Sequence, residues 1–462
     1  MHKKADTRLH FVGIGGIGMS GIAEVFFNQG YQVSGSDVLE SELTRRLRGL
    51  GVKVQIGHYA ENTFGADVVV ISSAIKATNP EVIEARKQRI PVIPRAEMLG
   101  ELMRGKTGIA VGGTHGKTTT TSMIASILTT AGVDPTIVIG GKVDSLGGNA
   151  KLGSGEFVLA EADESDGSFL HLPATYAVVT NIDNDHLDHF GSLDKIENTF
   201  VEFVGHLPFY GNAVVCLDDP GVKKCLGRFT KPVTTYGMNE DADYIAKNVV
   251  CEGLGSRFEV WKNASGKIAS VVLNVPGRHN VLNALASFTI GLQLGVSVDV
   301  IVQGLKNFTG VKRRFEIRWR NDPKKQAIVD DYGHHPTEVA ATLAAARNWW
   351  SGRIIAVFQP HRYSRTLHCR EGFLTAFQNA DVILLTDIYA AGEEPIDGVT
   401  SEALAKDLAR GALVTQKVVY LGDLDATRKG VLAQMHAGDL VLCLGAGSIT
   451  RIPDQLIESL DS

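Results

Sequence analysis

Cysteine is scarce in this 462-residue chain, and no two cysteines have the spacing of a pair. The five are scattered, with no C-x-x-C among them: Cys216, Cys225, Cys251, Cys369 and Cys443. Neither a disulfide framework nor a cysteine zinc site is therefore expected. We expect these thiols to serve as buried apolar filler. A reducing cytoplasm is the expected location.

Long apolar runs and an excess of positive charge are also missing. No stretch approaches the ~18 uninterrupted apolar residues of a membrane helix, and the opening MHKKADTRLHF lacks the apolar segment of a signal peptide. There are 46 lysines and arginines against 51 aspartates and glutamates, which gives a net charge of −5. Nonspecific nucleic-acid binding needs a basic face. We expect no membrane insertion and no nucleic-acid partner, whereas an anionic small substrate stays open.

The chain does contain a long alternation of apolar, β-branched runs with helical segments. Runs such as LHFVGIGG, DVVVISSA and RIIAVFQPHR end in glycine or polar residues, and segments such as KTTTTSMIASILTTAG lie between them. This pattern predicts an α/β fold with helices flanking parallel sheets. At roughly 100–200 residues per domain, two to four domains are expected. The motifs predict three, over 1–106, 107–310 and 311–462, with a small β excursion at 231–274 inside the second.

The first glycine-rich turn lies in LHFVGIGGIGMSGIAEVFFNQGYQVSGSD. Gly13, Gly15 and Gly18 form G-x-G-x-x-G between a strand and a helix, and Asp37 closes the next strand, 19 residues beyond Gly18. This is the context in which such glycines bind a diphosphate and an acid binds ribose hydroxyls. NAD, a UDP-sugar or another nucleotide diphosphate would suit it. A tight turn without a ligand is the alternative.

The second loop, GGTHGKTTTT at 112–121, is one residue too short for a strict G-x-x-x-x-G-K-[ST] phosphate loop. Val111 stands where the first glycine of that pattern would be. The context of strand, loop and helix is nevertheless that of a phosphate site. Backbone N–H groups would surround the phosphates, Lys117 would neutralise them, and the Thr118 hydroxyl would reach Mg²⁺.

Acidic residues follow two later strands of the second block. EADESD occupies 161–166, and NIDNDHLDHF occupies 181–190 with His186 among its aspartates. Oxygen-rich ligands beside phosphate favour Mg²⁺ over zinc. A purely structural histidine is the alternative for His186. Two phosphate-binding loops in one chain suggest two bound nucleotides.

Taken together, the motifs resemble those of the Mur ligases of bacterial peptidoglycan synthesis. In order, the chain contains HFVGIGGIGMSGIAE, PRAEML, GTHGKTTT, EADESD, NIDNDHLDHF, GRHNVLNALA, RRFE, DDYGHHPTE and FQPHRYSRT. GTHGK alone would also suit folylpolyglutamate synthetases. HFVGIGGIGMSG with EADESD and QPHRYSRT is most similar to the alanine-adding branch, and the branch that recycles a murein tripeptide is the nearest competitor. The short glycine loop is a property of the family.

The resemblance implies an ATP-dependent amide ligase with three domains: a UDP-binding Rossmann-like domain, a P-loop-like ATPase domain, and a C-terminal Rossmann-like domain that closes over the site. Such an enzyme would join L-alanine to the carboxylate of UDP-N-acetylmuramate through an acyl phosphate. Because both reacting partners of the first step are anions, ATP and Mg²⁺ are the expected cofactors. No nucleophilic side chain is required. A monomer or weak homodimer is expected.

The resemblance also implies roles for individual residues. The phosphate loop would be Gly113, Thr114, His115, Gly116, Lys117, Thr118 and Thr119. The adenine region would hold His279, Asn280 and Asn283, with Asp331 at the ATP ribose and Arg314 at the γ-phosphate. Magnesium ligands would be Thr118, Glu161 and, for a second ion, His186. The UDP-linked substrate would meet Gly15, Gly16, Ile17, Gly18, Asp37, Ser72 and Arg95.

The alanine region would be His335, His361, Arg362 and Arg365, since a guanidinium fork suits a carboxylate. A solvated basic loop is the alternative for the two arginines. The catalytic group would be Lys117, His186, Arg314 and His335; His335 or Asp331 could act as base, or the amine could arrive deprotonated. A carbamylated lysine, which some family members carry, cannot be assigned, although Lys195 is nearby.

Two other classes of function suit parts of the sequence. An NAD-dependent dehydrogenase would use GIGGIG but would leave GGTHGK, EADESD and NIDNDH without a role. A nucleotide sensor without catalysis would not need all the phosphate- and metal-type residues that the chain keeps. The ligase interpretation accounts for every motif.

Overall fold

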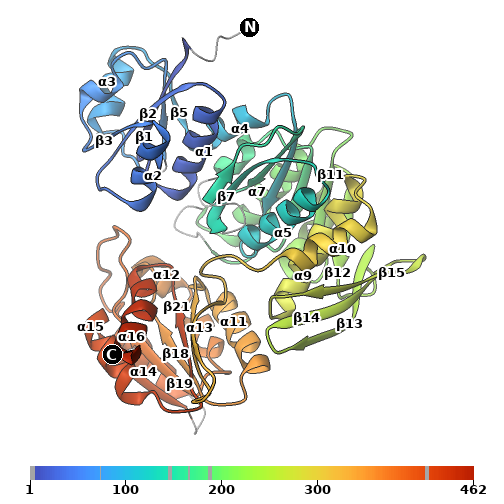
Figure 1. The fold of residues 1–462 in the computed structure, drawn as a ribbon, viewed down its shortest axis with the longest axis vertical. Helices are drawn as coiled ribbons and strands as arrows, with labels where there is room; N and C mark the ends of the chain where they lie inside the picture. Colours follow the sequence, from blue (N-terminus) through green and yellow to red (C-terminus); the bar gives the residue numbers. More distant parts are fainter. Residues whose placement is uncertain are drawn as a thin grey trace.

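Three sheets organise the computed structural model, which describes residues 6–72, 74–143, 148–164, 167–185, 190–411 and 416–461. They hold five, ten and six strands and follow one another along the chain. In Figure 1 the first sheet lies at the top in blue, the second at the right in green and yellow, and the third at the lower left in orange and red. The α/β fold class predicted from the alternation is confirmed.

The first sheet is parallel, in the order β3-β2-β1-β4-β5. Its strands are β1 (Arg8–Val12), β2 (Gln32–Asp37), β3 (Lys53–Ile56), β4 (Val68–Ile71) and β5 (Val92–Pro94). Its helices are α1 (Ile17–Asn28), α2 (Glu42–Leu50), α3 (Pro80–Lys87) and α4 (Arg95–Met103). The strand order reverses between β1 and β4, so the glycine turn after β1 lies where such sheets bind ligands.

The second sheet contains the phosphate loop near its middle. Its order is β15-β14-β13-β12-β11-β10-β6-β9-β7-β8. The strands are β6 (Thr107–Gly112), β7 (Thr136–Val143), β8 (Gly148–Lys151), β9 (Phe157–Glu161), β10 (Tyr176–Val179), β11 (Asn212–Cys216), β12 (Val233–Gly237), β13 (Tyr244–Glu252), β14 (Gly255–Lys262) and β15 (Gly266–Leu273). The helices are α5 (Lys117–Thr130), α7 (Leu193–Gly205), α8 (Pro220–Cys225), α9 (Arg278–Gln293) and α10 (Val298–Asn307).

The predicted β excursion is an extension of this sheet. Strands β13, β14 and β15 pair antiparallel, and β13 joins β12 in parallel through Tyr236 and Gly237. Helices α5, α9 and α10 pack together on the apolar core. Glycine is required at 304, because a Cβ there would lie 2.6 Å from the Ile127 Cα. Val111, which stands where the strict phosphate-loop motif has its first glycine, is fully buried in β6. This strand lies between β9 and β10.

The third sheet has the order β16-β17-β21-β18-β19-β20 and is parallel except for β16. Its strands are β16 (Glu316–Asn321), β17 (Gln326–Asp331), β18 (Ile354–Phe358), β19 (Val382–Thr386), β20 (Lys417–Gly422) and β21 (Leu440–Leu444). Its helices are α11 (Pro336–Trp349), α12 (Tyr363–His368), α13 (Arg370–Ala376), α14 (Ser401–Gly411), α15 (Leu424–Gln434) and α16 (Ile452–Asp461). Within the described residues, no helix is long and apolar enough to cross a bilayer.

Candidate active site

The first glycine turn is held by the strand next to it. The Gly13 and Ile14 N–H groups donate to the Ser36 carbonyl at 2.8 and 2.9 Å, and the Gly15 N–H donates to Asp37 Oδ2 at 2.8 Å. A Cβ on Gly15 would lie 2.9 Å from that same oxygen, so only glycine allows this approach. Asp37 thus lies at the turn, as the motif predicts.

The other predicted contacts of the UDP-linked substrate surround this turn. Gly16 precedes α1, Ile17 begins that helix with its side chain 47% exposed, and Gly18 follows within the first turn. Ser72 lies beside Gly13, and Arg95 packs against Gly18 while donating to Asp163 at 3.3 Å. Arg95 therefore links the first domain to the second. The structure brings these predicted residues together at one end of the first sheet.

A buried carboxylate behind the turn was missed by the sequence analysis. Glu81, fully buried at the start of α3, accepts a hydrogen bond from Ser36 Oγ at 2.6 Å and another from Asn62. His58 Nδ1 lies 3.4 Å and His10 Nε2 3.8 Å from the same carboxylate. Burial raises the pKa of Glu81, but these partners more than offset it and lower the pKa overall. Only the fold brings the four partners together, so no local signal predicts this network.

The phosphate loop turns tightly through two glycines. Gly113 has φ +126°, and a Cβ there would overlap Thr180 Oγ1; Gly116 has φ +84°, and its Cβ would lie 2.6 Å from Asn283 Oδ1. Helix α5 begins at Lys117 with no side-chain cap. The first N–H groups of an uncapped helix are open donors, and the helix dipole favours an anion there.

Lys117 lies under this loop. Its Nζ donates to the Gly113 and Thr114 carbonyls at 2.7 and 3.1 Å and to Glu164 at 2.8 Å. Burial lowers the pKa of Lys117, but nearby carboxylates led by Glu164 raise it overall, so the ammonium is kept. Burial raises the pKa of Glu164 to about 7 in spite of the lysine. Glu164 was not among the predicted site residues.

Two of the predicted magnesium ligands are in contact. Thr118 Oγ1 lies 3.0 and 3.1 Å from the two carboxylate oxygens of Glu161, at the end of β9. A hydroxyl and a carboxylate beside a phosphate loop form the oxygen donor set that Mg²⁺ prefers, so these residues fit the ion. The third predicted ligand, His186, lies outside the described residues. Lys195 lies in the first turn of α7, and nothing in its described surroundings marks it as modified.

A cavity of about 280 Å³ lies beside the phosphate loop and is lined by residues of both the second and the third domain. Its lining includes the predicted Thr119, His279, Asn280, Asn283, Arg314 and Asp331, with Cys216 and Tyr236 added by the fold. Burial, followed by the charge of Arg314, lowers the pKa of His279 to about 4. Burial raises the pKa of Asp331 to about 6, against hydrogen bonds from the Phe315 and Gly333 N–H groups. The residues predicted for adenine, ribose and γ-phosphate therefore line one pocket, together with His115, Gly116 and Thr119 of the phosphate loop.

The predicted alanine residues lie in the third domain, and two of them, Arg365 and His335, contact the second domain. Arg365 donates through Nε and Nη2 to Asp185 at 2.9–3.1 Å, and both side chains are buried. His361 Nδ1 lies 3.1 Å from Arg365 Nη1, and burial followed by that arginine lowers the pKa of His361 to about 4. Arg362 has φ +66° and lies 4.0 Å from Glu393. Arg365 is therefore not a solvated loop residue, because its fork is directed at Asp185.

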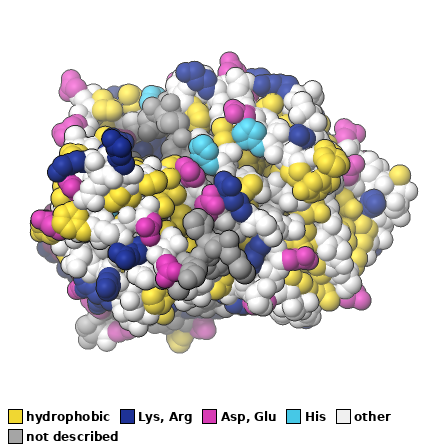
Figure 2. Space-filling model, turned by 90° about the horizontal axis from the view of Figure 1, so that it is seen from above, with side chains coloured by type: hydrophobic (Ala, Val, Ile, Leu, Met, Phe, Trp, Pro, Cys, Tyr) yellow, Lys and Arg dark blue, Asp and Glu magenta, His cyan; other side chains and the backbone are white. Residues whose placement is uncertain are grey.

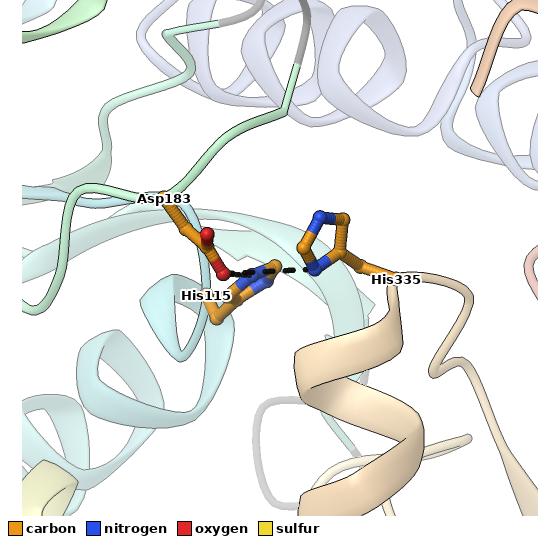
Figure 3. Close-up of side chains that lie close together, drawn as sticks. All are labelled: His115, Asp183 and His335. Carbon is orange, nitrogen blue, oxygen red and sulfur yellow. Dashed lines mark hydrogen bonds and ion pairs between the residues drawn. The ribbon is translucent and has the colours of Figure 1, made fainter. Parts of the chain in front are cut away.

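Figure 3 shows where the phosphate loop meets the third domain. His115 Nε2 lies 3.1 Å from Asp183 Oδ2, and His335 Nδ1 lies 3.6 Å from the same oxygen. His335 contacts the Asn184 carbonyl through Nε2 at 3.3 Å and accepts the Thr337 N–H at Nδ1, as a neutral ring does. Burial, followed by the charge of His115, lowers the pKa of His335.

The ligand atoms of His115, Asp183 and His335 lie within 4.8 Å of one another, which is also a spacing for a metal. Metal binding needs a free nitrogen lone pair on the histidine. His115 has none to offer, because its other nitrogen, Nδ1, faces Glu338 Oε1 at 3.3 Å. Two carboxylate neighbours make this ring a cation. We therefore interpret the cluster as an ion-pair network that joins two domains.

Figure 2 shows acidic and basic side chains interspersed over one face of the molecule, with histidines near its middle. The described part of that face carries no continuous basic surface. This distribution agrees with the small negative net charge and gives no support to a nucleic-acid partner.

Fold and site together define a three-domain α/β protein with a phosphate loop at the junction of its domains. The chain belongs to the Mur ligase family: the models of the Mur ligase family catalytic domain, the Mur ligase middle domain and the Mur ligase glutamate ligase domain match residues 8–107, 111–291 and 313–447. The predicted family is confirmed. The predicted boundaries at 106 and 310 stay a prediction.

Individual relatives resemble the chain over nearly its whole length. It is 53% identical to a UDP-N-acetylmuramate–L-alanine ligase of Geotalea daltonii, over 98% of each chain. The structure of a UDP-N-acetylmuramate–alanine ligase from Thermotoga maritima is similar with a TM-score of 0.83, 30% identity and coverage of 98% and 99%. The structure of a murein peptide ligase from Psychrobacter arcticus is similar with a TM-score of 0.72 and 26% sequence identity, over 98% of each chain.

Proposed function

We propose that this chain is an ATP-dependent ligase that joins L-alanine to the carboxylate of UDP-N-acetylmuramate in peptidoglycan precursor synthesis. The observation that carries the proposal is the 53% identity, over 98% of both chains, to a relative with that name. The described site supports it, because a glycine turn with an acid, a phosphate loop and a buried arginine all lie at the borders of the domains. A murein peptide ligase is the second candidate, favoured by one structural relative.

The reaction begins with two anions, which the site must bring together. ATP would bind with its phosphates at the start of α5 and its base in the cavity near Asn280 and Asn283. Lys117 and Arg314 would offset the charge as the substrate carboxylate attacks the γ-phosphate and ADP leaves. The product of this step is an acyl phosphate, which is a better electrophile than a carboxylate.

Thr118 and Glu161 would hold Mg²⁺, which when bound neutralises phosphate charge. Because the described donors are oxygen atoms, this ion fits the site. His186, the predicted ligand of a second Mg²⁺, lies outside the described residues and belongs to the proposal through the family resemblance alone. His335 enters as a neutral imidazole, which is the form that accepts a proton from an attacking amine.

L-Alanine would bind beside the Asp185–Arg365 ion pair, near His361. Its amine attacks the acyl phosphate, a tetrahedral intermediate forms, and phosphate leaves as the amide bond is made. A guanidinium fork suits the carboxylate of alanine, so we assign that role to Arg362, which has a more accessible side chain than Arg365. The proposal places the enzyme in the cytoplasm, as a monomer or weak homodimer.

The test is phosphate release by the full chain with ATP, Mg²⁺ and UDP-N-acetylmuramate, in the presence of L-alanine, L-serine, glycine or murein tripeptide. We expect release that depends on L-alanine and a product of the matching mass. Lys117→Ala should abolish release, whereas Lys247→Ala, a partly exposed lysine of β13 that pairs with Glu240, should not. Release that needs the tripeptide would favour the second candidate, and release without any amino acid dependence would reject both.

A further inference from the structure

The imidazole of His115 lies between two carboxylates that belong to different domains. Its Nε2 is 3.1 Å from Asp183 Oδ2, in the second domain, and its Nδ1 is 3.3 Å from Glu338 Oε1, in the third. An ionised carboxylate can only accept hydrogen bonds, so a ring nitrogen that pairs with one must carry a proton. One of the two contacts is a hydrogen bond and the other is an ion-pair contact. A carboxylate at each ring nitrogen is the environment of an imidazolium.

The backbone of His115 is held on both sides by the strand end that follows β10. Its N–H donates to Asn181 Oδ1 at 2.8 Å, and its carbonyl accepts from Thr180 Oγ1 at 2.6 Å and Asn181 Nδ2 at 3.0 Å. Asp183 is held as well, because Thr337 Oγ1 donates to it at 2.7 Å. The imidazolium is therefore fixed at the edge of the phosphate loop, two residues before Lys117.

Glu338 is a carboxylate of the third domain that reaches the loop histidine. It stands in the first turn of α11, where its carboxylate accepts the N–H groups of His334 and His335 at 3.1 and 3.4 Å. The helix N-terminus stabilises this charge. Glu338 Oε1, the oxygen that faces His115, also lies 3.3 Å from Arg314 Nη1. One carboxylate thus holds both a histidine of the phosphate loop and the arginine predicted at the γ-phosphate.

We propose that Glu338 is a positioning residue that completes the phosphate site when the third domain docks on the second. It holds His115 as a cation beside the phosphate loop and orients Arg314 toward the same loop. Without the third domain, Asp183 is the carboxylate that His115 keeps among the described residues, and one donating nitrogen satisfies it. Docking therefore adds the carboxylate of Glu338, a second ring proton on His115 and the guanidinium of Arg314 beside the phosphate loop. This inference deepens the proposed function and rests on it for the identity of the nucleotide.

The charges around His115 agree with this assignment. Burial lowers the pKa of His115, but its interactions with the accepting carboxylates of Asp183 and Glu338 more than offset it and raise the pKa to about 9. The pKa of each carboxylate is lowered against the effect of burial, for Glu338 chiefly by the histidines beside it. The remaining neighbour is the ring of His335, 4.7 Å away between centroids, whose own pKa is lowered. The shared proton therefore resides on His115.

The first test observes the ring itself in the full-length protein labelled with ¹⁵N-histidine. His115→Gln identifies its signals by their loss. At about pH 7.5, above the ordinary histidine pKa of about 6.5, both ring nitrogens should have imidazolium shifts in the wild type. They should shift to the neutral pattern in Glu338→Gln and stay unchanged in Glu402→Gln, a matched change on exposed α14. A neutral His115 in the wild type would overturn the proposal, whether or not any variant folds.

The second test separates positioning from general damage. Glu338→Gln should raise the KM for ATP and lower kcat, together by about tenfold to a hundredfold, while the KM for the UDP-linked substrate stays unchanged. Glu338→Asp, which keeps the charge on a shorter side chain, should restore part of the loss. Equal loss toward every substrate, without rescue by aspartate, would contradict the inference. Because the ring signals need no substrate, they report on Glu338 even if the proposed ligase reaction fails.

Discussion

The two glycine-rich loops of this protein are held in their conformations by different kinds of partner. The first is held by Ser36 and Asp37, about two dozen residues further along the chain and on the adjacent strand. The second depends on Thr180, Asn283 and Glu338, which come from distant parts of two domains. The first loop is held by residues of its own sheet, whereas the second is held by residues of two domains. Changes in the third domain should therefore affect the second loop and leave the first unaltered.

The largest expected effect would break the second loop alone. Lys117→Met removes the ammonium that lies between two loop carbonyls and Glu164. Phosphate release should fall by about a thousandfold or more, since this charge acts on the transferring phosphoryl group. Binding of the UDP-linked substrate, measured by calorimetry, should stay unchanged. A parallel loss of that binding would mean that the two loops are not independent.

The next effect concerns the ion pair that joins the second and third domains. Arg365→Ala removes the guanidinium that pairs with buried Asp185, and breaking a buried ion pair costs about 3–5 kcal/mol. We expect a lower midpoint of thermal unfolding and a higher KM for L-alanine. The double variant Asp185→Leu with Arg365→Met should regain stability without regaining alanine binding. Recovery of both would show that the pair has only a structural role.

A smaller effect should appear at the first loop alone. Glu81→Gln weakens the support behind Ser36, whose carbonyl holds the turn. We expect the KM for the UDP-linked substrate to rise about tenfold, which corresponds to about 1.4 kcal/mol, and the KM for ATP to stay unchanged. Glu84→Gln, on the same helix and facing Lys87 and Gln88, is the matched control. An equal rise in KM for Glu84→Gln would mean that Glu81 has no specific role in supporting the first loop.

Docking of the third domain should depend on pH through His115. Its pKa is raised to about 9 in the folded protein, against about 6.5 unfolded. A raised pKa means that the folded state binds the proton more tightly. The stabilisation is therefore fully present below about pH 6.5 and is lost as the pH rises through about 9. The difference in unfolding free energy between wild type and Glu338→Gln, measured across this range, should shrink accordingly.

The smallest effect should be that of the thiol in the nucleotide cavity. Burial raises the pKa of Cys216 to about 12, so no reactive thiolate is present at neutral pH. Mass spectrometry after brief alkylation should find Cys251, which is less buried, modified before Cys216. Cys216→Ala should change turnover by less than about twofold, because the side chain acts as apolar filler. Rapid alkylation of Cys216 would instead reveal an open cavity.

Much of this arrangement follows from local sequence. The alternation of strand and helix determines three sheets, because each apolar face must be covered. The glycines at 13, 15, 113 and 116 follow from close backbone approaches and positive φ, which side chains do not allow. Glu338 carries a partial local signal, since H-P-T-E is the pattern of a capped helix start. Even so, that pattern says nothing about the His115 that it meets.

What the sequence by itself determined is the chemistry of each loop: glycines for a diphosphate, a lysine for a phosphate, oxygen donors for magnesium. Only the tertiary structure decided which side chains pair with the carboxylates. Asp185 is directed at Arg365, Glu81 at Ser36, and Glu338 at His115 and Arg314. The reason is physical. The partners in these pairs are 24 to 223 residues apart in the sequence, and local propensity and motif spacing do not act across such separations. Buried charges are paired by folding, because an unpaired charge away from water is too costly to keep.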